Sequence, residues 1–486
     1  MDDQFDGGHE AWARHEFGGA MLSDVRHLRR VTRMAAGLAA RPAGSVGGAF
    51  VNVREARAAY EFLEHAEIDW RDLADASHRA CASRCAGREI VLVPIDGSSW
   101  TFIDRAQRKG LGPIGSRAQG AQGVKVMTAY ALSLEGVPQG VLAQTLWVRS
   151  QEPNAIEHKK RALEDKESRW WTVLQAQCED QLLGVRSPPK LWYQMDREAD
   201  QIAVLLRAAQ PGVLLTVRAD HNRVLAARTI GVEHETVKIF DLLADTPIQG
   251  HAYVRVSRND KRNRRVARVS IRFVDVRLHL RAQWSKRFVG NVSVTAVYVR
   301  EIDSPPNVDP LEWVLYTTYP VDNLDDALEV VRAYALRWRI ERMHYTTKTG
   351  AGHLHESQLR SFAALAKWII LHVAVASRLQ HVLHRSRNEP DVSASEEFSP
   401  EEIEATLLLR EQEYGKVYAS GATPSLGELV LFIAELGGYM GLKRSGGPPG
   451  IKIFERAFLR VEAAALAVAA LRARPRGGGG IHGSNA

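Results

Sequence analysis

The chain has few of the residues on which disulfide-bonded or zinc-binding domains depend. Cysteine occurs three times in 486 residues, at Cys81, Cys85 and Cys178, which is too few and too scattered for a disulfide framework. The first two cysteines also lack the second pair that a structural zinc site requires. We therefore expect a reduced, cytoplasmic protein.

Long apolar runs are missing as well. No uninterrupted run reaches the roughly 18 residues that a membrane span needs. The longest candidate, 363–379, is broken by Lys367 and His372, and we predict a buried helix there. The first residues are acidic, whereas a signal peptide begins basic and then turns apolar, so no membrane partner is expected.

The bulk composition is that of a folded, basic protein. Hydrophobic residues make up 45% of the chain, and 64 Lys and Arg against 57 Asp and Glu give a formal net charge of +7. This charge is compatible with a polyanionic partner such as nucleic acid but does not identify one. The length allows two to four domains.

Helical and strand-like patterns follow one another in blocks. Residues 11–76 have a helical, arginine-rich pattern. Apolar, β-branched runs then predict strands at 90–95, 124–134, 141–148 and 191–195. The second and third of these strands are joined by Glu-Gly-Val-Pro, which predicts a hairpin.

A second block of alternating pattern lies between about 211 and 320 and predicts a mostly antiparallel β segment. It contains a basic loop at 255–268, which suits either solvated surface or phosphate contacts. Helical patterns continue beyond it to a Gly-rich tail from Arg474, which we expect to be disordered. The fold class is therefore α/β with helical ends.

One helical segment near residue 340 carries the most unusual polar pattern. At about 100° per residue, four polar side chains project within an arc of roughly 60°: Tyr334, Arg337, Glu341 and Lys348. An ordinary charged helix face is the alternative. Such a face rarely places a single carboxylate between cations and beside two large aromatic rings, here Tyr334 and Trp338.

Three acidic residues have the distribution of a metal site. Asp96 and Asp196 each follow an apolar strand pattern, and Glu341 comes from the helix. Carboxylates of this kind can hold two Mg²⁺ ions roughly 3.5–4 Å apart, with Mn²⁺ as a substitute. The sequence His353-Leu-His355-Glu356 offers another metal set, but such a set in a loop is more often incidental.

These residues also carry a resemblance to a known family. The Asp96-Gly97-Ser98 strand, the pentapeptide Asp196–Asp200, and the 334–348 set followed by Thr-Gly-Ala-Gly resemble the acidic blocks of bacterial DDE insertion-sequence transposases of the fourth insertion-sequence family. The likeness extends to further motifs along nearly the whole chain: Asp24 with Arg26 and Arg30, Tyr60–Phe62, Pro310–Trp313, and Leu436–Met440.

The resemblance implies a ribonuclease H-like catalytic core interrupted by the antiparallel β insertion. Its domains would be a helical DNA-end-binding domain at 1–75, a catalytic domain at 76–385 with the insertion at about 211–320, and a helical dimerisation domain with the Gly-rich tail at 386–486. The implied partners are double-stranded DNA, as transposon terminal inverted repeats and target, and a second copy of the chain.

The resemblance also implies roles for individual residues. Asp96, Asp196 and Glu341 would bind two Mg²⁺ ions for end nicking, hairpin formation, hairpin opening and strand transfer. Trp313 would stack on a flipped base and Trp338 would fill its place. The remaining implied DNA contacts are Tyr334, Arg337, Lys348, Arg218, Arg26 and Arg30. From its position, Asp200 is expected to cap the following helix.

Two other functions stay open. A catalytically silent DNA-binding derivative would keep the basic helices but lose acidic ligands, and all three acidic ligands are present. A metal-dependent nuclease or resolvase would share the carboxylates but would have no use for Trp313 or an end-binding domain.

Overall fold

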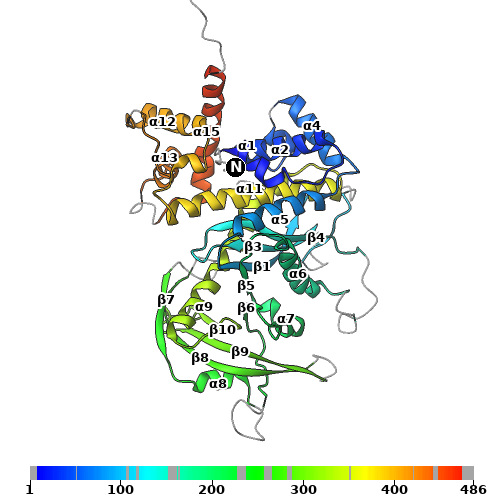
Figure 1. Cartoon of the computed structure of the whole chain (residues 1–486), viewed down its shortest axis with the longest axis vertical. Helices are drawn as coiled ribbons and strands as arrows, with labels where there is room; N and C mark the ends of the chain where they lie inside the picture. Colours follow the sequence, from blue (N-terminus) through cyan, green and yellow to red (C-terminus); the bar gives the residue numbers. More distant parts are fainter. Residues whose placement is uncertain are drawn as a thin grey trace, which may run out of the picture.

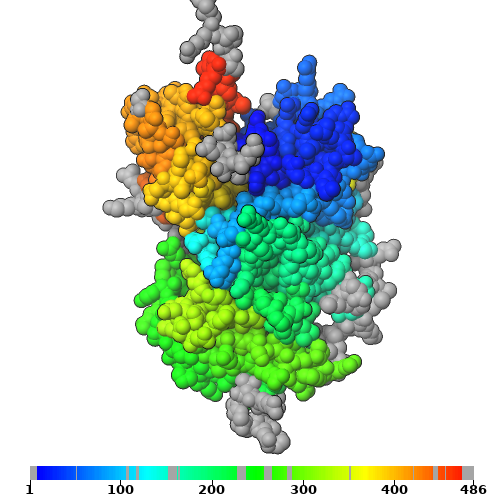
Figure 2. All heavy atoms as spheres, viewed as in Figure 1, coloured from blue at the N-terminus to red at the C-terminus, as the bar shows by residue number. Residues whose placement is uncertain are grey.

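The molecule consists of two helical regions at one end and a large twisted sheet that extends to the other end (Figure 1). The computed structural model describes residues 8–50, 52–104, 109–115, 120–151, 161, 165–226, 237–256, 265–281, 287–349, 352–419, 421–441 and 447–472. Most of the basic loop at 255–268 and the Gly-rich tail lie outside these residues. In the space-filling view, the amino-terminal and carboxyl-terminal helices form neighbouring masses above the sheet (Figure 2).

The amino-terminal region contains five helices: α1 (His9–Phe17), α2 (Val25–Ala40), α3 (Val46–Ala49), α4 (Val53–Glu64) and α5 (Trp70–Cys85). Short polar side chains begin several of them. Asp24, Asn52 and Asp69 each accept a hydrogen bond from the backbone N–H two residues later, which satisfies a donor that the first helical turn leaves unpaired.

The ten strands within the described residues form one sheet. Their bounds are β1 (Ile90–Thr101), β2 (Gly112–Pro113), β3 (Gln122–Leu132), β4 (Pro138–Trp147), β5 (Lys190–Met195), β6 (Leu214–Arg218), β7 (Gly250–Val256), β8 (Arg265–Arg281), β9 (Phe288–Glu301) and β10 (Glu312–Thr317). The order is β2-β3-β1-β5-β6-β10-β9-β8-β7, and β4 pairs with β3. The β3–β4 pairing confirms the predicted hairpin.

The pairing directions divide this sheet into two parts. β1, β5 and β6 are parallel neighbours, whereas β10, β9, β8 and β7 pair only antiparallel with their neighbours. Thus β6, which the sequence pattern grouped with the antiparallel segment, belongs with the parallel strands. The antiparallel strands continue the same sheet because β10 pairs with β6.

Helices and short 3-10 turns connect the strands and follow the last one. They are η4 (Glu167–Arg169), α6 (Trp170–Gln181), η5 (Arg197–Ala199), α7 (Ile202–Arg207), α8 (Ile239–Asp245), α9 (Leu324–Leu336), α10 (Trp338–Lys348), η7 (Leu354–Glu356), α11 (Phe362–Asn388), η8 (Ala394–Glu396), α12 (Pro400–Tyr414), α13 (Leu426–Leu436) and α15 (Ile451–Arg472).

Helix α11 is the predicted buried helix and lies between the helical regions and the sheet (Figure 1). By length and composition it could cross a membrane, but 83% of its apolar window is buried in the protein. The two polar residues within it have local explanations. Lys367 donates to the carbonyls of Leu63 and His65 at the end of α4, and burial lowers the pKa of His372 to about 3, which keeps the imidazole neutral.

The amino-terminal and carboxyl-terminal helices meet at a buried ionic contact. His9 Nε2 in α1 lies 3.0 Å from Glu402 Oε1 in α12 and 2.9 Å from Glu462 Oε1 in α15. The ring of Phe458 packs edge-on against the imidazole. All three helices are therefore joined at one point.

Candidate active site

Strand register places Asp96 and Asp196 side by side. Ile95 of β1 is opposite Met195 of the parallel strand β5, so the next residue of each strand is an aspartate. Neighbouring strands lie about 4.8 Å apart. Asp196 follows the end of β5, as predicted. Asp96 does not end its strand, because β1 continues to Thr101 paired with β3 alone.

The third carboxylate reaches these aspartates from a helix. Glu341 lies in the first turn of α10, which packs against β1. The predicted single helix is divided at Arg337, which ends α9 and begins α10 with right-handed helical angles. The side chain of Arg337 donates from Nη2 to Glu341 Oε1 at 2.8 Å.

Two of the three carboxylates, Asp96 and Glu341, are held in surroundings that disfavour their negative charge. Burial, with a smaller contribution from the charges of Asp196 and Glu341, raises the pKa of Asp96 to about 7 against the opposing effect of Arg337. Burial also raises the pKa of Glu341. Crowded, partly desolvated carboxylates are the oxygen donors that Mg²⁺ and Mn²⁺ prefer, and a divalent cation would relieve this repulsion. The donor set therefore fits a divalent metal.

The spacing of these oxygens differs from that of a single tight cluster. Within the described residues, the groups of three metal-capable side chains with all ligand atoms inside 4.8 Å are His353/His355/Glu356 and His9/Glu402/Glu462. Asp96, Asp196 and Glu341 do not form so tight a group. Their proximity is shown by the strand register and by the effect of Asp196 and Glu341 on the pKa of Asp96.

Arg337 is a buried cation with unused donors. Only 8% of the residue is exposed, and its Nε and Nη1 have no hydrogen-bond partner among the described residues. The guanidinium lies 5.9 Å from the ring of Tyr334 and 6.0 Å from that of Trp338. A guanidinium is a forked donor that suits a phosphate, and in this structure these two nitrogens are closed off from solvent.

The structure also brings together the other residues predicted near the scissile bond. Trp313 of β10 packs edge-on against Tyr334, with ring centroids 5.1 Å apart. Arg218, at the end of β6, donates to the carbonyl of Glu312 at 2.8 Å. Tyr334 is 4% exposed and Trp338 is 44% exposed. Of these two rings, that of Trp338 is therefore available to a ligand.

Lys348 ends the polar face, and a second lysine lies near it. Burial lowers the pKa of Lys348, while Asp96 raises it and Lys125 lowers it further. Lys125 of β3 donates to Ser99 Oγ of β1 at 2.9 Å. Sequence reasoning did not identify Lys125. Its only local signal was a charged residue in an otherwise apolar strand.

Asp200 does not cap α7, contrary to the prediction. The helix begins after Gln201 without a side-chain cap. Asp200 is buried, accepts from the backbone N–H groups of Asp220 and His221, and pairs with Arg223 at 2.6 Å. It therefore ties the segment after Asp196 to the segment after β6. The sequence alone could not indicate a partner 23 residues away.

The predicted amino-terminal contacts lie on α2. Arg26 pairs with Asp24 at 2.7 Å, and its side chain is 84% exposed. Arg30 pairs with Glu55 of α4 at 2.8 Å. The first arginine is therefore open to a ligand, while the second also braces two helices.

Comparison with known proteins gives two domain matches. Residues 9–68 match the family model described as transposase DNA-binding, and residues 179–377 match the model described as transposase DDE domain. The second match includes Asp196 and Glu341. Asp96 lies outside both matches.

A solved structure is also similar to this chain: the cryo-EM structure of the piggyBac transposase synaptic complex with hairpin DNA. The similarity has a TM-score of 0.33 and 10% sequence identity, and it covers 80% of this chain and 60% of that chain.

Proposed function

We propose that this chain, which combines a transposase DNA-binding domain with a transposase DDE domain, moves an insertion sequence by cut-and-paste transposition. Its substrates would be double-stranded DNA carrying terminal inverted repeats and the target DNA. The observation that carries the proposal is the crowding of Asp96, Asp196 and Glu341 around the buried guanidinium of Arg337. The carboxylates suit metal ions, and the guanidinium suits a phosphate.

Asp96, Asp196 and Glu341 would hold two Mg²⁺ ions, with Mn²⁺ as a substitute. Bound there, the ions would activate the attacking oxygen and neutralise the leaving oxygen. The protein's own contribution is positioning and charge: Arg337 would place its guanidinium beside the phosphate, and Lys348 adds a point charge near Asp96.

The proposed reaction has four phosphoryl transfers at one site. Water nicks the transposon end, the freed 3′ hydroxyl attacks the opposite strand to form a hairpin, a second water opens the hairpin, and the 3′ hydroxyl then joins target DNA. Hairpin formation needs a sharply bent strand. Trp313 would stack on a base flipped out of the duplex and the exposed Trp338 would fill the vacated space.

The strand arrangement supports a ribonuclease H-like core. β3 and β1 are antiparallel, and β5 and β6 follow β1 in parallel. In this proposal α2 contacts the transposon end through Arg26 and Arg30. The helices beyond residue 386 would join two copies of the chain, since both transposon ends must be cut together, and the protein would act in the bacterial cytoplasm.

Cleavage of DNA bearing the matched terminal repeats tests the proposal. We expect Mg²⁺-dependent nicking and hairpin formation, lost in Asp96→Ala, Asp196→Ala and Glu341→Ala while DNA binding is retained. Asp241→Ala, which removes an exposed carboxylate on α8, is the matched control.

Three results would contradict the proposal. Normal cutting by Glu341→Ala would show that the assigned ligand set is wrong. A wild-type protein that binds the repeats but never cuts would be a silent derivative. Cutting that ignores the terminal repeat would indicate a nuclease or resolvase.

A further inference from the structure

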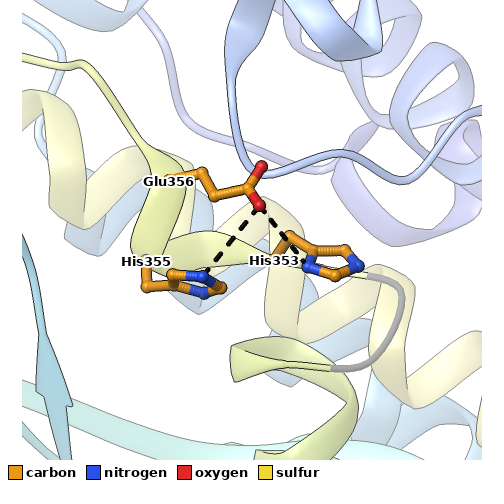
Figure 3. Close-up of side chains that lie close together, drawn as sticks. All are labelled: His353, His355 and Glu356. Carbon is orange, nitrogen blue, oxygen red and sulfur yellow. Dashed lines mark ion pairs between the residues drawn. The ribbon is translucent and has the colours of Figure 1, made fainter.

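Two imidazoles and a carboxylate lie close together shortly after α10. His353, His355 and Glu356 come from the short turn η7, and the Glu356 carboxylate lies between the two rings (Figure 3). Glu356 Oε1 is 3.7 Å from His353 Nδ1 and 4.0 Å from His355 Nε2. Their ligand atoms all lie within 4.8 Å of one another.

These distances are longer than a direct hydrogen bond, which would be about 2.7–3.2 Å long. Two ligands that each lie about 2.0–2.2 Å from one metal ion are separated by up to about 4 Å, so the two separations from Glu356 lie at the upper end of that range. The contacts are ion pairs when the imidazoles are protonated, and an ion bound between the neutral rings and the carboxylate would draw the three side chains closer together.

A contact outside the group sets the orientation of one ring. His355 Nδ1 lies 3.1 Å from the backbone carbonyl of Lys348. Because a carbonyl only accepts, Nδ1 carries the hydrogen when this ring is neutral, and Nε2 keeps its lone pair on the side of Glu356. A carbonyl that fixes the tautomer of a histidine in this way is typical of metal-binding histidines.

The backbone of this turn is held by two different regions. His353 has left-handed angles, φ 39° and ψ 33°, and the loop between α2 and α3 packs on its carbonyl. A Cβ atom on Gly44 would lie 1.8 Å from that oxygen, so the close approach requires glycine. The turn thus connects the loop after α2 to the last residue of α10.

We propose that His353, His355 and Glu356 bind a divalent ion of the zinc class. Imidazole nitrogens favour Zn²⁺, Co²⁺ or Ni²⁺ over Mg²⁺, so this site differs in chemistry from the all-carboxylate site. All three residues are exposed, which leaves the remaining positions of the ion open to water. The proposal does not depend on the reaction that the carboxylate site performs.

Zinc titration of the DNA-free, full-length protein by calorimetry tests the site, with excess Mg²⁺ present to occupy the oxygen-only site. We expect one tight Zn²⁺ per chain and a rise in Tm on zinc addition. Both should be lost in the double variant His353→Asn with His355→Gln. Asparagine is chosen because it tolerates left-handed angles. Glu356→Gln should weaken binding, and Co²⁺ in place of zinc should give visible absorption in the wild type only.

Two control variants separate this site from other histidines. His251→Asn changes an exposed histidine on β7, and Glu462→Gln changes the buried group of His9, Glu402 and Glu462. Both should bind zinc like the wild type. Unchanged binding in the His353/His355 double variant would overturn the proposal, as would loss of binding in Glu462→Gln alone. Metal-free Tm values equal to the wild type would establish that the double variant is folded.

Discussion

Arg337 donates a hydrogen bond from Nη2 to Glu341 Oε1, one helical turn along the chain, at 2.8 Å. A candidate phosphate ligand and a candidate metal ligand are therefore bonded to each other. The guanidinium lowers the pKa of both Glu341 and Asp96, against the effect of burial. Arg337 therefore offsets part of the unfavourable effect of burial on these two carboxylates.

Removing Arg337 is expected to make metal binding more dependent on pH. Without the guanidinium, the pKa of Asp96 should rise above about 7, so a proton competes with the metal at neutral pH. The pH of half-maximal Mn²⁺ affinity should move upward in Arg337→Ala. Arg337→Lys, which keeps a positive charge, should show a smaller upward shift than Arg337→Ala. An unchanged profile, or the same shift in the exposed control Arg332→Ala, would contradict this coupling.

Replacing Asp96 should stabilise the metal-free protein while abolishing cleavage. Because the pKa of Asp96 is raised from 3.8 to about 7, its charge costs folding free energy, and this cost grows as the pH rises from about 4 and is complete above about 7. Asp96→Asn should therefore increase the free energy of unfolding by about 1–3 kcal/mol at pH 8 in EDTA, with little gain near pH 4. Denaturant unfolding at both pH values measures this. Equal effects at the two pH values would indicate a packing change instead.

Trp313 should act at the hairpin step. The centroid of its ring lies 5.1 Å from that of Tyr334. Trp313 is thus in contact with the polar face but is not one of the carboxylate ligands. Trp313→Ala is expected to spare the first nick and to reduce hairpin formation, whereas Trp313→Phe should retain part of the stacking. Products resolved on a denaturing gel distinguish the two steps. Equal losses at both steps would assign the tryptophan a structural role.

The contact between the two helical regions should depend on pH. Burial opposes the positive charge of His9, but Glu402 and Glu462 raise the pKa of His9 to about 9. The charged His9 therefore stabilises the fold fully below pH 6.5, and this contribution is lost as the pH rises through about 9. Burial also raises the pKa of Glu462 to about 7, whereas His9 lowers that of Glu402 to about 2.

Replacing each glutamate tests that contact. Glu402→Gln leaves the His9 charge without its ionised partner and should cost about 3–5 kcal/mol at pH 6. At pH 6 Glu462 is largely protonated, and glutamine resembles its protonated carboxyl. Glu462→Gln should therefore lower the free energy of unfolding much less than Glu402→Gln. Thermal unfolding of the two variants across pH measures both effects. Equal losses of stability in the two variants would show that Glu402 and Glu462 do not differ in protonation as proposed.

Local features of the fold were predictable because short-range rules produce them. The β3–β4 hairpin follows from turn residues between two apolar runs. The buried helix α11 was also predicted correctly. The division at Arg337 was not, because the periodicity of the side chains continues through it without change.

The sequence by itself predicted that Tyr334, Arg337, Glu341 and Lys348 lie near one another, because helical spacing brings such side chains together, although the structure places them on two helices that meet at Arg337. Only the tertiary structure decided that Asp96 and Asp196 are neighbours, since strand register depends on pairing between distant segments. It likewise placed Lys125 near Lys348, gave Asp200 its partner Arg223, and turned His353, His355 and Glu356 toward one point. These contacts arise from packing and backbone direction, which residue type and spacing do not specify.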